Sequence, residues 1–314
     1  MKMKKSREEF EKDLMVKVAW YYYIENMTQQ KISDYIGVSR MRVVKLLEKA
    51  RRTGIVQFQI RSDLSKRMKL EQAIINEYNL KDAYIVPTNP NSNGINETIA
   101  KAGAMYIGNR ITENSFINFG YGDTLSRTLR HLANNVDADL GVSYVSLTGG
   151  VNYYLPNNQS NNTYNAQLHL MPAPLVASSG EMARAMKNEA SIQEISNMTR
   201  LASMTIVGIG AMSEDATIIK SSILNKNDFL LLSMKGAVGD ILCQFIDKDG
   251  DLIDAEIHSR LISTPLSSIK TLDNVVGIAA GDSKVTAIKA ALRGQYVDIL
   301  ITDENTGLGL VDVG

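Results

Sequence analysis

Residues Met27 to Arg52 read M-T-Q-Q-K-I-S-D-Y-I-G-V-S-R-M-R-V-V-K-L-L-E-K-A-R-R, and this stretch predicts two short helices joined by a tight turn. Thr28 and Ser39 precede the two helical runs, where a side-chain oxygen can cap a helix. Gly37 suits the left-handed conformation that ends the first helix. This is a helix-turn-helix pattern, whose second helix can lie in the major groove of DNA.

The polar residues of this stretch lie on the outer side of the expected helices, because Val43, Val44, Leu46 and Leu47 form an apolar inner face. The side chains expected to reach phosphates or base edges are Thr28, Gln29, Gln30, Ser39, Arg40, Arg42 and Lys45. The alternative is a three-helix packing module with a solvated basic face.

The flanking segments complete a small domain. A preceding helix is expected from the apolar spacing of Val16, Ala19, Trp20, Tyr23 and Ile24. Trp20 and the tyrosines that follow it are interpreted as packing residues. The alternation in residues 54–60 suggests a strand that forms a small wing, as in winged-helix domains.

The charge distribution separates the segment that ends after the expected wing from the rest of the chain. Residues 1–61 contain 14 Lys and Arg against 7 Asp and Glu, whereas residues 62–314 contain 20 against 27. A net charge of +7 in the first part is typical of a module that binds DNA. We therefore expect a DNA-binding domain in residues 1–61 and a second domain in residues 62–314.

Composition excludes several classes of protein. The 314 residues are 44% hydrophobic, which is enough to form a large core, but no apolar run reaches the roughly 18 residues that span a bilayer. Cys243 is the only cysteine, so no internal disulfide is possible, and the three histidines lack metal-ligand spacing. We expect a cytoplasmic protein with no metal and no cofactor.

The larger part alternates between strand-like and helix-like segments. Short apolar runs predict strands at 83–87, 116–119, 143–147, 204–209, 229–233, 275–280 and 299–302. Helical spacing is found at 66–79, 95–111, 124–133, 181–187 and 284–293. This alternation predicts a Rossmann-like α/β fold with a mostly parallel sheet, which binds ligands beyond the carboxyl ends of its strands.

Three glycine-containing loops follow predicted strands. They are Gly120-Tyr121-Gly122-Asp123-Thr124, Thr148-Gly149-Gly150 and Gly281-Asp282-Ser283-Lys284. Glycines allow close backbone approach, and helix starts favour anions, so the three loops together favour a phosphorylated ligand. Each loop alone is equally consistent with a tight turn. The third glycine of a dinucleotide fingerprint is missing after Gly122, which disfavours a dinucleotide.

One acidic residue completes this candidate site. Asp240 ends the glycine-rich segment Gly236-Ala237-Val238-Gly239-Asp240. It is expected either to bind ligand hydroxyls or to cap a helix.

These motifs together resemble the SorC family of bacterial sugar-binding regulators, sometimes grouped with DeoR-type repressors. The resemblance covers nearly the whole chain and is carried by Tyr21-Tyr22-Tyr23…Met27-Thr28-Gln29, Gly120-x-Gly122-x-Thr124-Leu125, Thr148-Gly149-Gly150, Gly208-Ile209-Gly210, Gly236-Ala237-Val238-Gly239-Asp240 and Ala280-Gly281…Lys284…Ile301-Thr302-Asp303. The strings Pro172-Ala173-Pro174-Leu175-x-Ala177-Ser178-Ser179 and Asp215-Ala216-Thr217-Ile218-Ile219 are similar to the branch that regulates autoinducer-2 uptake, and Val18-Ala19-Trp20-Tyr21-Tyr22-Tyr23 to a branch that regulates erythritol use.

The resemblance implies a repressor of a carbohydrate or autoinducer-2 operon, with a second domain similar to sugar-phosphate isomerases. It implies a dimer or tetramer that leaves double-stranded operator DNA when a phosphorylated sugar or polyol binds. The residues expected to line the effector site are Tyr121, Gly122, Asp123, Thr124, Thr148, Gly149, Gly150, Asp240 and Lys284.

Two other functions fit parts of the sequence. A sugar-phosphate isomerase or deaminase with an accessory DNA-binding module would need a positioned acid and base. Asp240 and Lys284 are the available candidates, but no base–nucleophile pair is evident. The other alternative is a DNA-binding assembly protein, which would not need phosphate-binding loops.

Overall fold

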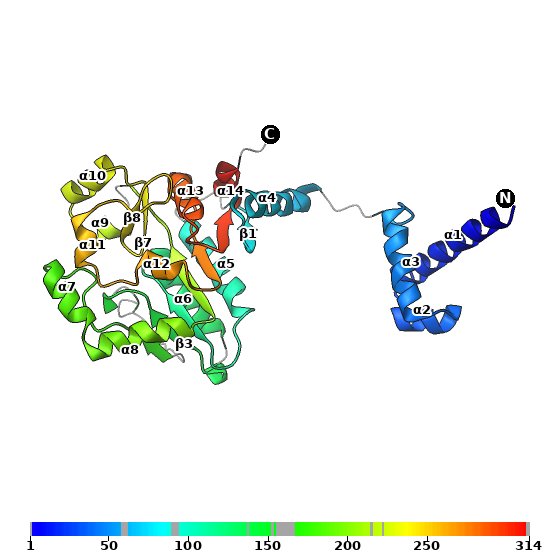
Figure 1. Ribbon diagram of the computed structural model, residues 1–314, viewed down its shortest axis with the longest axis horizontal. Helices are drawn as coiled ribbons and strands as arrows, with labels where there is room; N and C mark the ends of the chain where they lie inside the picture. Colours follow the sequence, from blue (N-terminus) through cyan, green and yellow to red (C-terminus); the bar gives the residue numbers. More distant parts are fainter. Residues whose placement is uncertain are drawn as a thin grey trace. The chain divides into compact units, whose positions relative to one another are not determined.

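The chain folds into two compact units, residues 1–64 and 65–314. The computed structural model describes residues 2–57, 62–88, 94–136, 138–151, 154, 167–213, 216–221 and 223–311 (Figure 1). In this part of the chain, no helix is long and apolar enough to cross a membrane.

The first unit contains the expected helix-turn-helix. Helix α1 spans Lys2–Tyr23, α2 Gln29–Ile36 and α3 Arg40–Arg52. The hydroxyls of Thr28 and Ser39 cap α2 and α3 by accepting from the backbone amides of Lys31 and Arg42, respectively. Gly37 ends α2 with a φ of 76°, in the left-handed region that favours glycine. The sequence therefore predicted both caps and the turn.

The residues that α1 buries differ in part from those expected from its apolar spacing. Its buried residues are Leu14, Met15, Val18 and Ala19. Trp20 is instead 54% exposed, with its indole N–H donating to Glu25 at 3.2 Å, so it is not a core residue of this unit. Tyr21, Tyr22 and Tyr23 are partly buried against the core, as expected for packing residues. The predicted wing strand lies mainly outside the described residues, since the structure describes only positions 54–57 of that segment.

The second unit is built on a seven-stranded sheet in which every described strand pair is parallel. The strand order is β1-β10-β9-β5-β2-β3-β4, with bounds β1 Asp82–Val86, β2 Phe116–Phe119, β3 Ser143–Ser146, β4 Gln167–His169, β5 Met204–Gly208, β9 Val275–Ile278 and β10 Ile299–Asp303. Beside it lies a small antiparallel sheet of β6 (Gly210–Ala211), β7 (Gly239–Ile241) and β8 (Gln244–Ile246).

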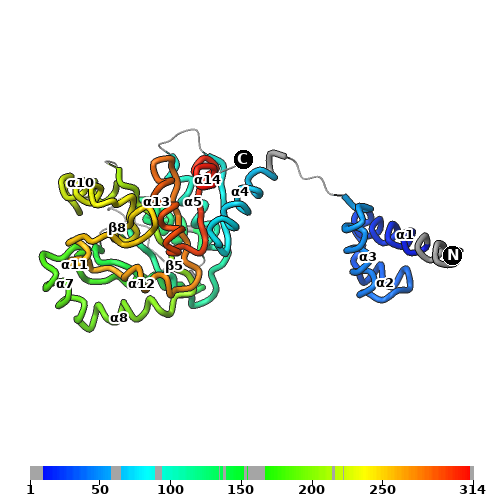
Figure 2. Tube along the Cα trace, turned by 45° about the horizontal axis from the view of Figure 1, so that its top comes forward, coloured from blue at the N-terminus to red at the C-terminus, as the bar shows by residue number. Residues whose placement is uncertain are grey.

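Helices cover both faces of the large sheet, and Figure 2 traces the path of the chain through these elements. On one face, Ile206 and Ile278 pack in a core formed with α5 (Ile95–Gly108) and α6 (Asp123–Asn135). On the other face, Val207 and Leu300 pack in a core formed with α4 (Ser62–Tyr78), α13 (Val285–Arg293) and α14 (Glu304–Leu310). The strands β2, β3, β5, β9 and β10 are buried on both faces, which explains why they read as apolar runs.

The remaining helices all lie between β4 and β9 along the chain. Their bounds are α7 Gly180–Lys187, α8 Ala190–Met198, α9 Thr217–Lys220, α10 Lys226–Met234, α11 Glu256–Arg260 and α12 Leu266–Ile269. The strand predicted at 229–233 was wrong, because these residues belong to α10. The Asn225 side chain caps this helix by accepting from the amide of Asp228, and only Phe229 and Leu232 of its apolar run are buried.

Candidate functional site

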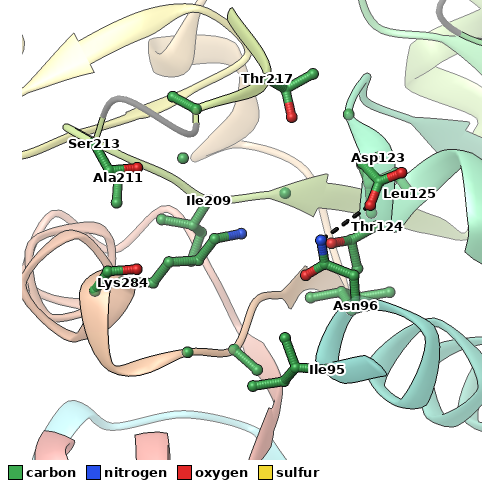
Figure 3. A pocket seen from close by; sticks show the side chains of 18 of the residues that line it. Ile95, Asn96, Asp123, Thr124, Leu125, Ile209, Ala211, Ser213, Thr217 and Lys284 are labelled. Atoms are coloured by element: carbon green, nitrogen blue, oxygen red, sulfur yellow. Dashed lines mark hydrogen bonds between the residues drawn. The ribbon is translucent and has the colours of Figure 1, made fainter. Parts of the chain in front are cut away.

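A cavity of about 650 Å³ opens at the carboxyl ends of the parallel strands (Figure 3). Its walls come from the turns after β2, β5, β9 and β10 and from the first turn of α5. Ligands of open α/β sheets bind at this edge, because loops and helix starts converge there. Of the predicted effector residues, Tyr121, Gly122, Asp123, Thr124, Asp240 and Lys284 all line this cavity.

Two segments that begin helices contribute backbone to the cavity. Gly122 precedes α6 with a φ of 130°, and Gly281 precedes the 3₁₀ turn η5 (Asp282–Lys284) with a φ of 117°. Both values lie in the region that side chains rarely adopt, which explains the glycines. The first amides of a helix have no acceptor within it and attract anions. The segment at Gly281 leads directly into the longer helix α13.

Lys284 provides the positive charge of the cavity. Its side chain extends from η5 into the space that Figure 3 shows. In the described part of the chain, its ammonium makes no hydrogen bond and no direct ion pair. Burial lowers the pKa of Lys284, although the carboxylates of Asp240 and Asp123 act in the opposite direction. A buried cation without a direct partner marks a place for an anionic ligand.

Asp240 provides a buried carboxyl on another wall. It lies on β7, not in a helix cap as one interpretation of the sequence had it. Its Oδ2 accepts from the amide of Cys243 at 3.0 Å and from the hydroxyl of Tyr121 at 3.4 Å. Burial raises the pKa of Asp240 to about 6, against the opposing effects of these bonds and of Lys284.

The glycines around Asp240 are explained by close packing. Gly210 of β6 is paired with Asp240 in the small sheet, and a Cβ on Gly210 would collide with Oδ1 of Asp240. A Cβ on Gly239 would lie 2.5 Å from that of Ala287 and 2.6 Å from the carbonyl oxygen of Gly210. These two glycines therefore let the small sheet hold the carboxyl against the cavity.

The structure does not bring Thr148, Gly149 and Gly150 to this cavity. Their backbone amides donate to Tyr154 Oη at 3.2 Å, to the carbonyl of Ile262 at 2.9 Å and to that of Ala173 at 2.8 Å, respectively. The expected phosphate contact therefore has no available amide donor in this loop. A Cβ on Gly149 would lie 2.7 Å from the carbonyl oxygen of Ala173, so close packing explains this glycine.

Several cavity residues were missed from the sequence. They include Thr88, Asn96, Ser213, Thr217, Lys220 and Asn305. Thr88, Asn96 and Asn305 are single polar residues just after β1, at the start of α5 and at the start of α14. A search of every strand end and helix start for polar residues, not only of glycine-rich loops, would have found these three.

The predicted DNA-binding residues form two groups on the first unit. Thr28, Gln29, Gln30 and Arg40 border one shallow depression, while Arg42 and Lys45 border another with Lys49 and Arg52. Ser39 lies exposed between the two helices. Met41, which is not among the predicted residues, is 64% exposed between Arg40 and Arg42 and is a further candidate for base contact.

Comparisons with known proteins agree with this architecture. Residues 62–312 match the Sugar-bind family, described as a sugar-binding domain. The transcriptional regulator LsrR of an Escherichia coli strain is 34% identical over 304 residues, covering 96% of this chain and 95% of LsrR. LsrR of an Enterobacter strain is 32% identical over 299 residues, covering 94% and 92% of the two chains. The chain belongs to the SorC family of sugar-binding transcriptional regulators.

A solved structure supports the same assignment. The full-length sorbitol operon regulator SorC from Klebsiella pneumoniae has a TM-score of 0.67 and 25% identity, and the match covers 94% of this chain and 97% of that one. Because the relatives of this SorC-family chain are transcriptional regulators, the comparison favours a regulator over an enzyme. No group of three or more His, Cys, Asp or Glu among the described residues could hold a metal ion.

Proposed function

We propose that this chain is a repressor that leaves its operator when a phosphorylated sugar or polyol binds the cavity of the second unit. The observation that carries this proposal is the Lys284 ammonium, which faces the cavity and has no direct partner among the residues that the structure describes. A phosphate beside Gly122–Thr124 and Gly281–Ser283 would meet the starts of α6 and η5 as well as this charge.

The other end of the ligand is proposed to contact Asp240. A carboxylate accepts hydrogen bonds from hydroxyls, and a buried carboxylate charge is costly even with the two hydrogen bonds that Asp240 already accepts. A sugar or polyol hydroxyl that donates to Asp240 would reduce this cost. Lys284 and Asp240 together therefore favour a ligand with a phosphate and at least one hydroxyl.

The signal is proposed to leave the cavity through α14. This helix begins beside the cavity, where Asp303 and Asn305 line the wall. The Thr306 hydroxyl accepts from the amide of Gly281 at 2.7 Å, so the turn at the phosphate site is bonded to α14. Helix α4, which packs against α14, is the first helix of the second unit along the sequence. A ligand that shifts α14 would thus bias the helix that leads toward the DNA-binding unit.

A thermal-shift screen with phosphorylated sugars and polyols tests this function. We expect at least one compound to raise the melting temperature without being consumed, because a sensor binds its effector without turning it over. Turnover of the bound compound would support the isomerase or deaminase alternative. Binding with no effect on DNA affinity would reject the proposed repressor mechanism.

A further inference from the structure

Asn96 lies in the first turn of α5 and faces the cavity beside Asp123, the first residue of α6 (Figure 3). Its Nδ2 donates to Asp123 Oδ2 at 3.0 Å. A carboxylate can only accept hydrogen bonds. The nitrogen of the Asn96 amide must therefore face Asp123, and its oxygen must face away.

Asp123 is itself held in place from the other side. Nε of Arg127 donates to both carboxylate oxygens of Asp123 at 3.0 Å. Nη1 of the same guanidinium donates to Glu97 Oε2 at 3.0 Å, and His131 Nε2 lies 2.7 Å from Glu97 Oε1. Burial opposes the charge of Glu97, but the bonds from Arg127 and His131 outweigh it, and the pKa of Glu97 is lowered.

We infer that Asn96 Oδ1 is a fixed hydrogen-bond acceptor that selects a hydroxyl of the effector, and that Arg127 is the positioning residue that holds Asp123 and, through it, the amide. An unheld amide could rotate and present either its oxygen or its nitrogen. With the nitrogen engaged by Asp123, the site recognises a donor at this position. The inference rests on the proposed function of the cavity.

This role separates Asn96 from the phosphate-binding groups. A bare phosphate near Lys284 needs amides and a cation, whereas a hydroxyl-bearing ligand gains an additional bond at Asn96 Oδ1. Removing one buried hydrogen bond to a ligand weakens binding by roughly 3- to 10-fold. Asn96 should therefore affect the preference for a sugar phosphate over inorganic phosphate, not the affinity for phosphate itself.

The experiment measures binding of inorganic phosphate and of ribose 5-phosphate to the full chain by calorimetry. The variants are Asn96→Ala, which removes the acceptor, and Arg127→Met, which removes the guanidinium but keeps most of the stem. Lys101→Met is the matched control, because Lys101 is a cation of the same cluster that lies 3.9 Å from Glu97 and makes no ion pair with Asp123. Melting temperatures confirm that each variant is folded.

We expect Asn96→Ala to reduce the preference for ribose 5-phosphate by roughly 3- to 10-fold while inorganic phosphate binds as in wild type. Arg127→Met should reduce the ratio of the affinity for ribose 5-phosphate to that for inorganic phosphate by a smaller factor. Lys101→Met should leave this ratio unchanged. An unchanged ratio in Asn96→Ala, or an equal loss for both ligands, would overturn the role of Asn96 but not the phosphate site. Failure of wild type to bind either ligand at millimolar concentration would overturn the proposed function and this inference together.

Discussion

The hydroxyl of Tyr78 in α4 donates a 2.7 Å hydrogen bond to the carbonyl of Leu310 in α14, although 232 positions separate the two residues. Near this bond, Gly307 of α14 packs so closely that an added Cβ would lie 3.2 Å from side-chain atoms of both Leu70 and Ile85. Helix α14 therefore lies against α4 on one side and begins at the cavity. Helix α14 thus connects the cavity with α4, the first helix of the second unit along the sequence.

Changes at this contact should weaken the coupling between effector and DNA. We expect Tyr78→Phe and Gly307→Ala to alter the ratio of operator affinities without and with effector by several-fold, because both change the α4–α14 contact. Effector affinity measured without DNA should change little. The exposed Leu308 on the same helix gives the control Leu308→Ala, which should couple normally. Wild-type ratios in both test variants would show that the signal does not pass through this contact.

Asp240→Asn should stabilise the effector-free protein at neutral pH. The pKa of Asp240 rises from 3.8 to about 6 on folding, so the folded state holds its proton at pH values where the unfolded state has lost it. The free energy of unfolding should therefore fall as pH rises from about 4 to 6, by roughly 3 kcal/mol in total, and stay reduced above that range.

The asparagine variant lacks this titration. Its stability relative to wild type should thus increase between pH 4.5 and 7.5, as measured by urea unfolding. It should also lose effector recognition, since the proposed hydroxyl acceptor has lost its charge. A difference in stability that does not depend on pH would contradict the raised pKa.

The basic residues at the start of α3 should contribute to DNA affinity. Replacing Arg40 or Arg42 with Ala should cost about 1–3 kcal/mol if the side chain contacts a base, and should relax specificity at that base pair. Lys45→Ala should instead reduce the salt dependence of DNA binding. A variant with one phosphate contact fewer releases fewer counterions when it binds DNA. Lys248→Ala, which removes an exposed lysine from the other unit, is the control. Gel-shift affinities that match wild type in all three test variants would reject this surface.

Specific recognition should require an oligomer. One helix-turn-helix reads few base pairs, so two copies on half-sites about one helical turn apart are expected to provide the specificity of an operator. Light scattering at micromolar concentration should therefore give at least the mass of a dimer. A monomeric mass both with and without operator DNA would be incompatible with this expectation.

The sequence predicted the elements that depend on local chemistry. The caps at Thr28 and Ser39 and the left-handed Gly37 follow from side-chain hydrogen bonding and backbone freedom, and the parallel strands follow from apolar runs buried on both faces. The loops at Gly122 and Gly281 were identified for the same reason, since glycine permits their positive φ values.

The remaining features depend on tertiary contacts. Gly149 looks like a phosphate-loop glycine, but its amide is bonded to Ile262, which lies far away in sequence. The run beginning at Phe229 is apolar enough for a strand, yet the cap at Asn225 and one-sided burial make it a helix. Asn96 belongs to no motif, and its position beside Asp123 comes only from the packing of α5 on α6.

The most direct test titrates a complex of the protein and operator DNA with the phosphorylated and unphosphorylated forms of one sugar. The DNA is a duplex that the protein selects from a random pool, and the sugar phosphate is one that the thermal-shift screen identifies. Wild type, Lys284→Met and the charge-matched control Lys248→Met are compared. We expect the phosphorylated form to weaken DNA binding by about 5- to 150-fold in wild type and in the control. Lys284→Met should bind DNA normally and remain bound, and the unphosphorylated sugar should have no effect. Equal release by the unphosphorylated sugar, or a wild-type response in Lys284→Met, would contradict the phosphate site on which the account rests.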